Sequence, residues 1–341
     1  MKKIYLLIGT SALLMVLSCK KNDSLTLPSD PPTPITPYVT DNSFKIVSYF
    51  PSYRDPAGIA DSKFKMITHL FYAFLNPNTD GSLVALAQPG RFTTVIQKAK
   101  ANGVKTGISI SGTKSIFVTM AASATARNMF VKNVLTFAKT NNLDGIDMDW
   151  EYPSTSDGSA DNYVLLMKEL SDSLHQYHKF LSAAITPGVY AGSIRDGLKS
   201  EVFPVVDFFN IMVYDGIGWD KNEPVQHASY NMAVASLNYW LNTRGMPKEK
   251  AVLGIPAYGK NAGNSAKAYR DFVTAGADVS LDNALIDGVQ FYFNGTITTR
   301  KKARLAKDIA NGIMFWEFYH DDNGNPSIIR AANDELGRNY N

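Results

Sequence analysis

The sequence predicts an α/β fold, a (β/α)8 or TIM barrel with a short or vestigial insertion between its seventh and eighth strands. From residue 44 onward, eight short apolar runs rich in β-branched and aromatic residues alternate with segments of helical periodicity. This alternation is typical of parallel βα units, and the chain is long enough for the roughly 250 residues that eight units need. An open doubly wound sheet is the competing architecture, but no glycine-rich phosphate loop follows the first run. We therefore expect a closed barrel, with functional side chains at the carboxyl ends of its strands.

The expected strands begin just after a proline-rich segment. In chain order they are Lys45–Phe50, His69–Leu75, Gly107–Ser111, Gly145–Glu151, Leu181–Thr186, Phe208–Tyr214, Ala251–Pro256 and Gly312–Trp316. Apolar residues recur three and four positions apart between several of these runs, as at Phe130, Val134 and Ala138, which predicts helices that cover the barrel. Only residues 257–311 separate the last two strands, so any insertion there is small.

The N-terminal region differs in pattern from the rest of the chain. Lys2 and Lys3 precede the apolar run Ile4–Leu17, which is short for a membrane span and has the layout of a secretory signal. A small residue, Ser18, precedes Cys19, the single cysteine, as in a bacterial lipobox. We expect a signal peptide at residues 1–18 and a lipid on Cys19. A plain signal peptide or a buried core cysteine are the alternatives.

Prolines recur among the polar residues that follow this region. Such a composition predicts an extended spacer, here within residues 19–43, and the barrel domain then occupies residues 44–341. The protein would be an exported lipoprotein at the outer membrane or surface of a Gram-negative bacterium, bound to the membrane through its lipid alone.

Composition narrows the classes of partner. Hydrophobic residues make up 45% of the chain and charged residues 19%, which fits a packed globular protein and excludes wholesale disorder. The net charge of +3 includes Lys2 and Lys3, so the mature surface is close to neutral and does not call for nucleic acid. A single cysteine excludes an internal disulfide and thiol catalysis in the barrel. We expect a monomer.

The segment Leu143–Pro153 carries the strongest chemical signal. Side chains on a strand alternate between its faces, so Asp147, Asp149 and Glu151 point the same way, into the barrel. Three carboxylates this close cannot all ionise cheaply, so the row must hold a proton. Glu151 lies at the open end of the row and is the natural proton donor.

A solvated edge strand and a metal site are the alternatives for the acidic row, and both fit less well. A solvated edge strand would not carry Ile146, Met148 and Trp150 on its reverse face. A calcium loop needs a glycine at its sixth position and an irregular backbone. The five histidines supply no ligand pair on this segment. We expect a carboxylate acid that works with neither a metal nor a cofactor.

The acidic row resembles a family signature. Asp144, Asp147, Asp149 and Glu151 form an Asp-x-x-Asp-x-Asp-x-Glu motif that resembles that of the glycoside hydrolase family 18 chitinases. The likeness extends from about Lys45 to Asp321. Segments similar to the family's first, second, sixth, seventh and eighth strands follow in order at Ser48–Phe50, Tyr72–Phe74, Met212–Asp215, Leu253–Gly259 and Gly312–Glu317.

The resemblance implies roles for the catalytic candidates. The family uses the 2-acetamido group of its own substrate as the nucleophile, with retention of configuration. Glu151 would protonate the leaving oxygen and later activate water. Asp149 would hold the acetamido N–H, and Asp147 would share a proton with Asp149. Tyr214 would donate its O–H to the acetamido oxygen.

The resemblance also implies substrate-binding residues. Trp316 would stack beneath the sugar at the cleavage site, since aromatic faces suit the apolar faces of pyranose rings. Tyr49 and Ser109 would support the buried aspartate. Further pocket candidates are Phe74, Met212 and Asp215. Plain core packing is the alternative for Tyr49, Phe74 and Met212.

Two departures from the family pattern bear on the substrate. The family's third strand usually carries Ser-x-Gly-Gly-Trp, but here the residues are Ser109-Ile110-Ser111-Gly112-Thr113, and Lys260 stands where an arginine often does. Because Thr113 stands in the place of the tryptophan and the insertion is small, we expect a shallower cleft. Such a cleft favours soluble oligosaccharides over crystalline chitin.

Three functions therefore remain open. The first is hydrolysis of β-1,4 bonds next to N-acetylglucosamine in chitin or chito-oligosaccharides. The second is an endo-β-N-acetylglucosaminidase that releases N-glycans, and the third is a catalytically silent lectin for chitin oligosaccharides.

Overall fold

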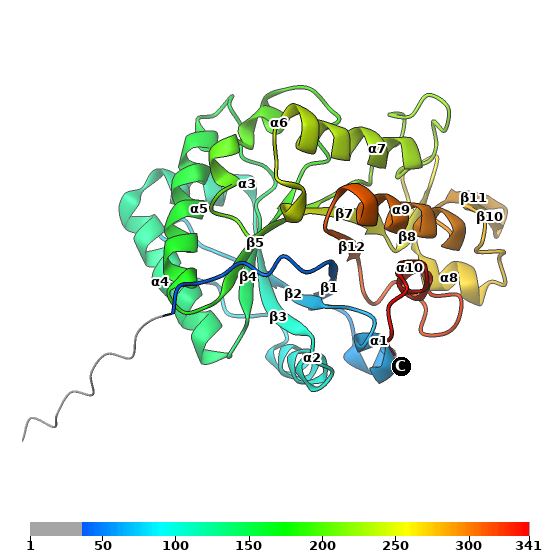
Figure 1. Cartoon of the computed structure of the whole chain (residues 1–341), viewed down its shortest axis with the longest axis horizontal. Coiled ribbons are helices and arrows are strands. Elements are labelled where there is room, and N and C mark those ends of the chain that lie inside the picture. Colours follow the sequence, from blue (N-terminus) through cyan, green and yellow to red (C-terminus); the bar gives the residue numbers. More distant parts are fainter. Residues whose placement is uncertain (1–35, 341) are drawn as a thin grey trace, which may run out of the picture. The chain divides into compact units, whose positions relative to one another are not determined.

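The computed structural model describes residues 36–340 (Figure 1). The expected signal peptide, the lipidation site Cys19 and most of the spacer lie outside these residues. None of the helices in the described part is both long and apolar enough to cross a membrane.

Eight parallel strands close into a barrel, which confirms the predicted fold class (Figure 1). They are β1 (Lys45–Pro51), β2 (His69–Leu75), β3 (Lys105–Ser111), β4 (Gly145–Asp149), β5 (Phe180–Ile185), β6 (Phe208–Ile211), β7 (Ala251–Pro256) and β12 (Gly312–Trp316). Each neighbours the next around the ring, and β12 closes it against β1. All eight predicted runs are strands, with ends displaced by a few residues.

Helices follow most strands. They are α1 (Asp61–Phe64), α2 (Pro89–Ala101), α3 (Lys114–Ala122), α4 (Ala124–Thr140), α5 (Ser159–His175), α6 (Ser193–Gly197), α7 (Tyr230–Asn238), α9 (Thr296–Ile309) and α10 (Ile328–Leu336). On α5, Tyr163, Leu166, Leu170 and Leu174 are buried at helical spacing, while Lys168 and Asp172 face solvent. This amphipathic pattern packs the helices on the outside of the barrel.

A small second sheet lies between β7 and β12. Its strands are β8 (Tyr258–Asn261), β9 (Ala266–Ala268), β10 (Asn283–Ile286) and β11 (Val289–Tyr292), antiparallel in the order β10-β11-β8-β9, with α8 (Tyr269–Thr274) between β9 and β10. The insertion is short, as predicted, but it is a folded element rather than a bare loop.

Side-chain alternation on β4 divides the acidic segment as expected. Ile146, Met148 and Trp150 belong to the apolar layer between strands and helices. Asp147 and Asp149 face inward, in register with Ser109 and Ser111 of β3. The strand therefore delivers its carboxyl groups to the barrel interior and leaves its apolar side chains to the helices.

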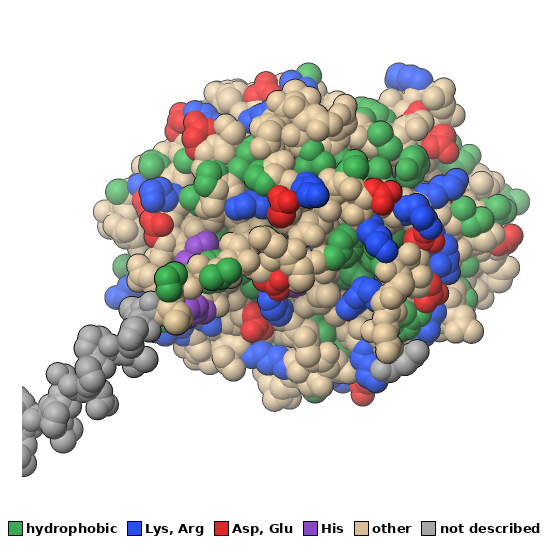
Figure 2. Space-filling view, viewed as in Figure 1, with side chains coloured by type: hydrophobic (Ala, Val, Ile, Leu, Met, Phe, Trp, Pro, Cys, Tyr) green, Lys and Arg blue, Asp and Glu red, His purple; other side chains and the backbone are tan. Residues whose placement is uncertain are grey.

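The N-terminal strap, residues 37–43, packs across the amino ends of the strands. Tyr38 stacks on His175 with ring centroids 3.9 Å apart, and Lys105 Nζ lies 2.6 Å from Asp41 Oδ2. Acidic and basic side chains are interspersed over the face seen in Figure 2. The strap thus joins the barrel at the amino ends of the strands, opposite to their carboxyl ends.

Candidate active site

A cleft with a volume of about 730 Å³ opens at the carboxyl ends of the strands. Its lining includes seven residues at or just after strand ends: Phe74, Ser111, Glu151, Met212, Tyr214, Asp215 and Trp316. The remaining lining consists of Tyr152, Tyr258 and the segment after β5, which contributes Thr186, Pro187 and residues 190–195. Six of the ten residues that the sequence predicts for the site therefore line one cavity.

Asp147 lies beneath the cleft and is fully buried. Tyr49 Oη and Ser109 Oγ donate to its Oδ2 at 2.9 and 2.7 Å, and Ser182 Oγ and Asn210 Nδ2 donate to its Oδ1 at 2.7 and 3.2 Å. Burial raises the pKa of Asp147, although these four hydrogen bonds favour the ionised form. Both oxygens are thus occupied by neutral donors from four other strands.

Asp149 lies one step closer to the cleft and has a different environment. Its Oδ1 is buried without a hydrogen-bond partner. Burial raises the pKa of Asp149 well above its ordinary value, and the neighbouring Glu151 and Asp147 carboxyl groups add to the effect. Of the two neighbouring carboxyl groups, Glu151 has the larger effect on the pKa of Asp149. Within the row, the surroundings of Asp149 therefore favour its protonated form most strongly, with Glu151 above it and Asp147 below.

Asp215 has the opposite electrostatic setting. Tyr258 Oη donates to its Oδ1 at 2.7 Å, and Lys260 Nζ lies 2.5 Å from the same oxygen. Burial alone would raise its pKa, but the neighbouring His227 and Lys260 and the hydrogen bond from Tyr258 hold the pKa of Asp215 well below its ordinary range. Lys260 thus supplies the positive charge expected of an arginine, and Asp215 presents an ionised carboxylate to the cleft.

Two aromatic side chains form part of the cleft wall. The rings of Trp316 and Phe74 stack with centroids 5.8 Å apart and an interplanar angle of 17°. Non-proline cis peptide bonds occur at Ala73–Phe74, Glu151–Tyr152 and Trp316–Glu317, all at the carboxyl ends of strands.

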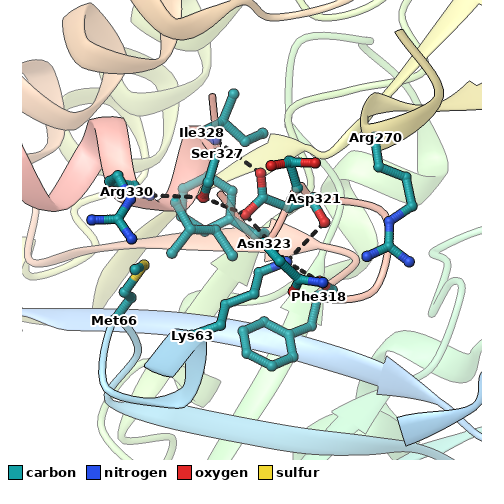
Figure 3. Close-up of polar contacts among 12 residues, drawn as sticks. Lys63, Met66, Arg270, Phe318, Asp321, Asn323, Ser327, Ile328 and Arg330 are labelled. Atoms are coloured by element: carbon teal, nitrogen blue, oxygen red, sulfur yellow. Dashed lines mark hydrogen bonds and ion pairs between the residues drawn. The ribbon is translucent and has the colours of Figure 1, made fainter. Parts of the chain in front are cut away.

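A buried ion pair anchors the loop that follows Trp316 (Figure 3). Asp321 is fully buried and lies 3.3 Å from Lys63 Nζ of α1. Ser327 Oγ and the Ile328 N–H donate to its carboxylate at 2.6 and 2.8 Å. These contacts fix the chain between β12 and α10, which is the segment that directly follows Trp316.

Sequence reasoning missed several residues of the site. Ser182 and Asn210 both donate to Asp147, and Ser182 lies in register with it. Alternation along their strands could have identified both as inward-facing polar residues. The wall at 186–195 has no motif in the sequence. Within residues 36–340, no three His, Cys, Asp or Glu side chains are grouped as a metal site would need.

A closed βα barrel that brings the carboxyl groups of Asp149 and Glu151 together at its mouth is typical of a glycosidase. The chain belongs to family 18 of the glycosyl hydrolases, since the model of that family matches residues 45–321.

Individual relatives agree with this assignment. A class V chitinase of Arabidopsis thaliana is 30% identical over 314 residues, which cover 83% of this chain and 80% of the relative. Endochitinase 1 of Metarhizium anisopliae is 28% identical, over 82% and 81% of the two chains. The crystal structure of the chitinase ChiB from Flavobacterium johnsoniae superposes with a TM-score of 0.71 at 28% identity, over 86% of this chain and 94% of ChiB.

Proposed function

We propose that the protein is a retaining glycoside hydrolase that cleaves β-1,4 bonds next to N-acetylglucosamine in chitin or chito-oligosaccharides. The observation that carries this proposal is the Asp149–Glu151 pair in the cleft, in which a buried carboxyl oxygen lacks a partner. An acetamido N–H is a donor of the kind that this oxygen lacks. The chitinase relatives support the choice of substrate.

In the first step, Glu151 gives its proton to the glycosidic oxygen while the bond from that oxygen to the anomeric carbon breaks. The acetamido carbonyl oxygen of the same sugar forms a new bond to the anomeric carbon, which yields a cationic oxazolinium ring. When Asp149 accepts the acetamido N–H, its ionised form is favoured, and the proton of the pair passes to Glu151. Substrate binding thereby protonates the acid.

In the second step, the Glu151 carboxylate takes a proton from water as the water oxygen attacks the anomeric carbon. The bond to the acetamido oxygen breaks, and the sugar keeps its original configuration. Tyr214, which lines the cleft, donates its hydroxyl to the acetamido oxygen and holds it in line for attack. Asp147 remains below, where four hydrogen bonds hold it in place beneath Asp149.

The walls of the cleft suit a sugar chain. Trp316 and Phe74 offer apolar surface to a pyranose ring, while Asp215 accepts hydrogen bonds from hydroxyl groups. Met212 completes the apolar lining next to Tyr214. The small insertion leaves the cleft with little extra wall, which favours soluble oligosaccharides.

The proposal extends to the location of the protein. We propose that residues 1–18 are removed as a signal peptide, that Cys19 carries a lipid, and that the monomeric barrel is held at the outer membrane or cell surface. The position of the N-terminal strap supports this, because it enters the barrel opposite the cleft. Labelled fatty acid should be incorporated into the wild-type protein and not into the Cys19→Ala variant.

Product analysis by mass spectrometry tests the activity. The purified protein is incubated with N-acetylated chito-oligosaccharides and, separately, with a high-mannose glycoprotein. We expect shorter chito-oligomers from the first substrate. Free glycan from the second alone would instead identify an N-glycan-releasing enzyme, and binding of oligomers without turnover would identify a lectin.

A further inference from the structure

Ser111 lies opposite Asp149 on the neighbouring strand, just as Ser109 lies opposite Asp147. The register of β3 and β4 pairs Ser109 with Asp147 and Ser111 with Asp149. Residues two apart on a strand share a face, so both serines point into the barrel. In the lower pair, Ser109 Oγ donates to Asp147 at 2.7 Å.

The upper pair is open to the cleft. Ser111 lines the cavity, while Asp149 is buried just beneath it. The backbone of Ser111 is fixed, because Asn76 Nδ2 donates to its carbonyl oxygen at 2.7 Å. Its side chain is therefore presented to Asp149 from a rigid strand end.

We propose that Ser111 is a positioning residue, whose hydroxyl donates a hydrogen bond to Asp149 and holds that carboxylate toward Glu151 and the substrate. This inference rests on the proposed function and deepens it, since it assigns a residue that controls which member of the Asp149–Glu151 pair carries the proton. Asp147 has no oxygen free for this task, because four donors already occupy it.

The electrostatics of Asp149 agree with this geometry. Burial and the Glu151 and Asp147 carboxyl groups raise the pKa of Asp149, and the Ser111 hydroxyl acts against them by favouring the ionised form. The carboxyl group of Asp149 also interacts electrostatically with four tyrosines from the elements around it. They are Tyr49 of β1, Tyr152 after β4, Tyr163 of α5 and Tyr214 after β6. A donor at Ser111 shifts the proton of the pair toward Glu151, where the first step needs it.

Removal of the hydroxyl makes a specific kinetic prediction. In Ser111→Ala, the proton stays on Asp149 more of the time, so fewer enzyme molecules have a protonated Glu151 and an ionised Asp149. We expect kcat on N-acetylated chitotetraose to fall about tenfold, as for loss of a hydrogen bond to a charged group, with KM changed less than about twofold. Both limbs of the pH–rate profile should move to higher pH.

Two variants separate this role from simple packing. Ser111→Thr keeps the hydroxyl and should restore most of the rate and the original pH profile. Ser115→Ala removes an exposed hydroxyl nearby, bonded only to Thr113 in this structure, and should match the wild-type protein.

A carboxyl ¹³C NMR titration tests the inference independently of turnover. The Asp149 resonance, assigned with Asp149→Asn, should titrate at higher pH in Ser111→Ala than in the wild-type protein or in Ser115→Ala. An unchanged Asp149 titration in Ser111→Ala would overturn the role of Ser111, whatever the activity. Absence of turnover by the wild-type protein would instead contradict the proposed function.

Discussion

The two ends of the barrel bury similar carboxyl groups in opposite ways. At the amino end, Asp207 accepts hydrogen bonds from Thr40 Oγ1 and the Leu181 N–H, both at 2.8 Å, and from His175 Nε2 at 3.0 Å. At the carboxyl end, Asp149 is about equally buried, yet one of its oxygens has no partner. The hydrogen bonds of Asp207 hold the barrel's amino end together, whereas the unpartnered oxygen of Asp149 can meet a ligand.

The pKa values of the two groups move in opposite directions. Burial raises both, but at Asp207 the hydrogen bonds from His175, Leu181 and Thr40 lower the pKa below its ordinary value. At Asp149 the neighbouring Glu151 and Asp147 add to burial, and the pKa rises. Hydrogen bonds and the neighbouring histidine thus favour the anion at Asp207, whereas burial and carboxyl neighbours favour the protonated form at Asp149.

The largest expected effect is at the cleft end of β4. Glu151→Gln removes the acid and base but keeps the shape of the side chain, so kcat should fall at least about 10³-fold, within the range for loss of general acid–base catalysis. Binding of chito-oligosaccharides, measured by calorimetry, should persist. Near-normal turnover would show that another group is the acid.

A smaller effect is expected at Tyr214. Tyr214→Phe removes only the hydroxyl that would hold the acetamido oxygen, and kcat should fall about 10²-fold, as for loss of one donor to a developing charge. Steady-state kinetics with the same oligosaccharide measures this. A rise in KM with an unchanged kcat would mean that Tyr214 serves binding alone.

The amino end should respond in stability rather than in rate. Asp207→Asn places an amide N–H₂ opposite one of the existing donors, which should lower the free energy of unfolding by about 2 kcal/mol without changing kcat. The low pKa of Asp207 in the folded protein means that its contribution is present above about pH 4 and is lost as pH falls through that pKa. The free energies of unfolding of the variant and the wild-type protein should therefore converge at acidic pH. Urea denaturation at several pH values measures this, and a difference that persists in acid would contradict the role of Asp207.

Metal removal should have the smallest effect. The proposed chemistry uses carboxyl groups and the substrate's own amide, so dialysis against a chelator should leave kcat unchanged. Loss of activity that returns with an added divalent cation would mean that the reaction depends on a metal.

Much of the fold could be predicted because the barrel strands are buried on both faces. Runs such as Ala251–Pro256 and Phe208–Ile211 are predominantly apolar, with Asn210 as their one polar side chain, and all eight predicted runs are strands. The second sheet was not predicted as such. Its strands β9 and β10 have three and four residues, none of them fully buried, so their sequences carry almost no periodic signal.

The site was predictable where chemistry and strand alternation coincide. Asp147 and Asp149 follow from the acidic row, and Tyr49 and Ser109 do contact Asp147. The wall at residues 186–195 could not be predicted, because a loop is positioned by packing and not by a repeating pattern. The pairing of Asp215 with Lys260 likewise depends on two strand ends that meet only in the folded barrel.

The proposed mechanism depends on the substrate's acetamido group as the nucleophile, with Glu151 transferring the proton. Its sharpest test is proton NMR of the first product formed from N-acetylated chitotetraose, recorded before mutarotation. We expect a β-anomer from the acetylated substrate and no reaction with the fully deacetylated oligomer. An α-anomer, or equal turnover of the deacetylated oligomer, would contradict the mechanism.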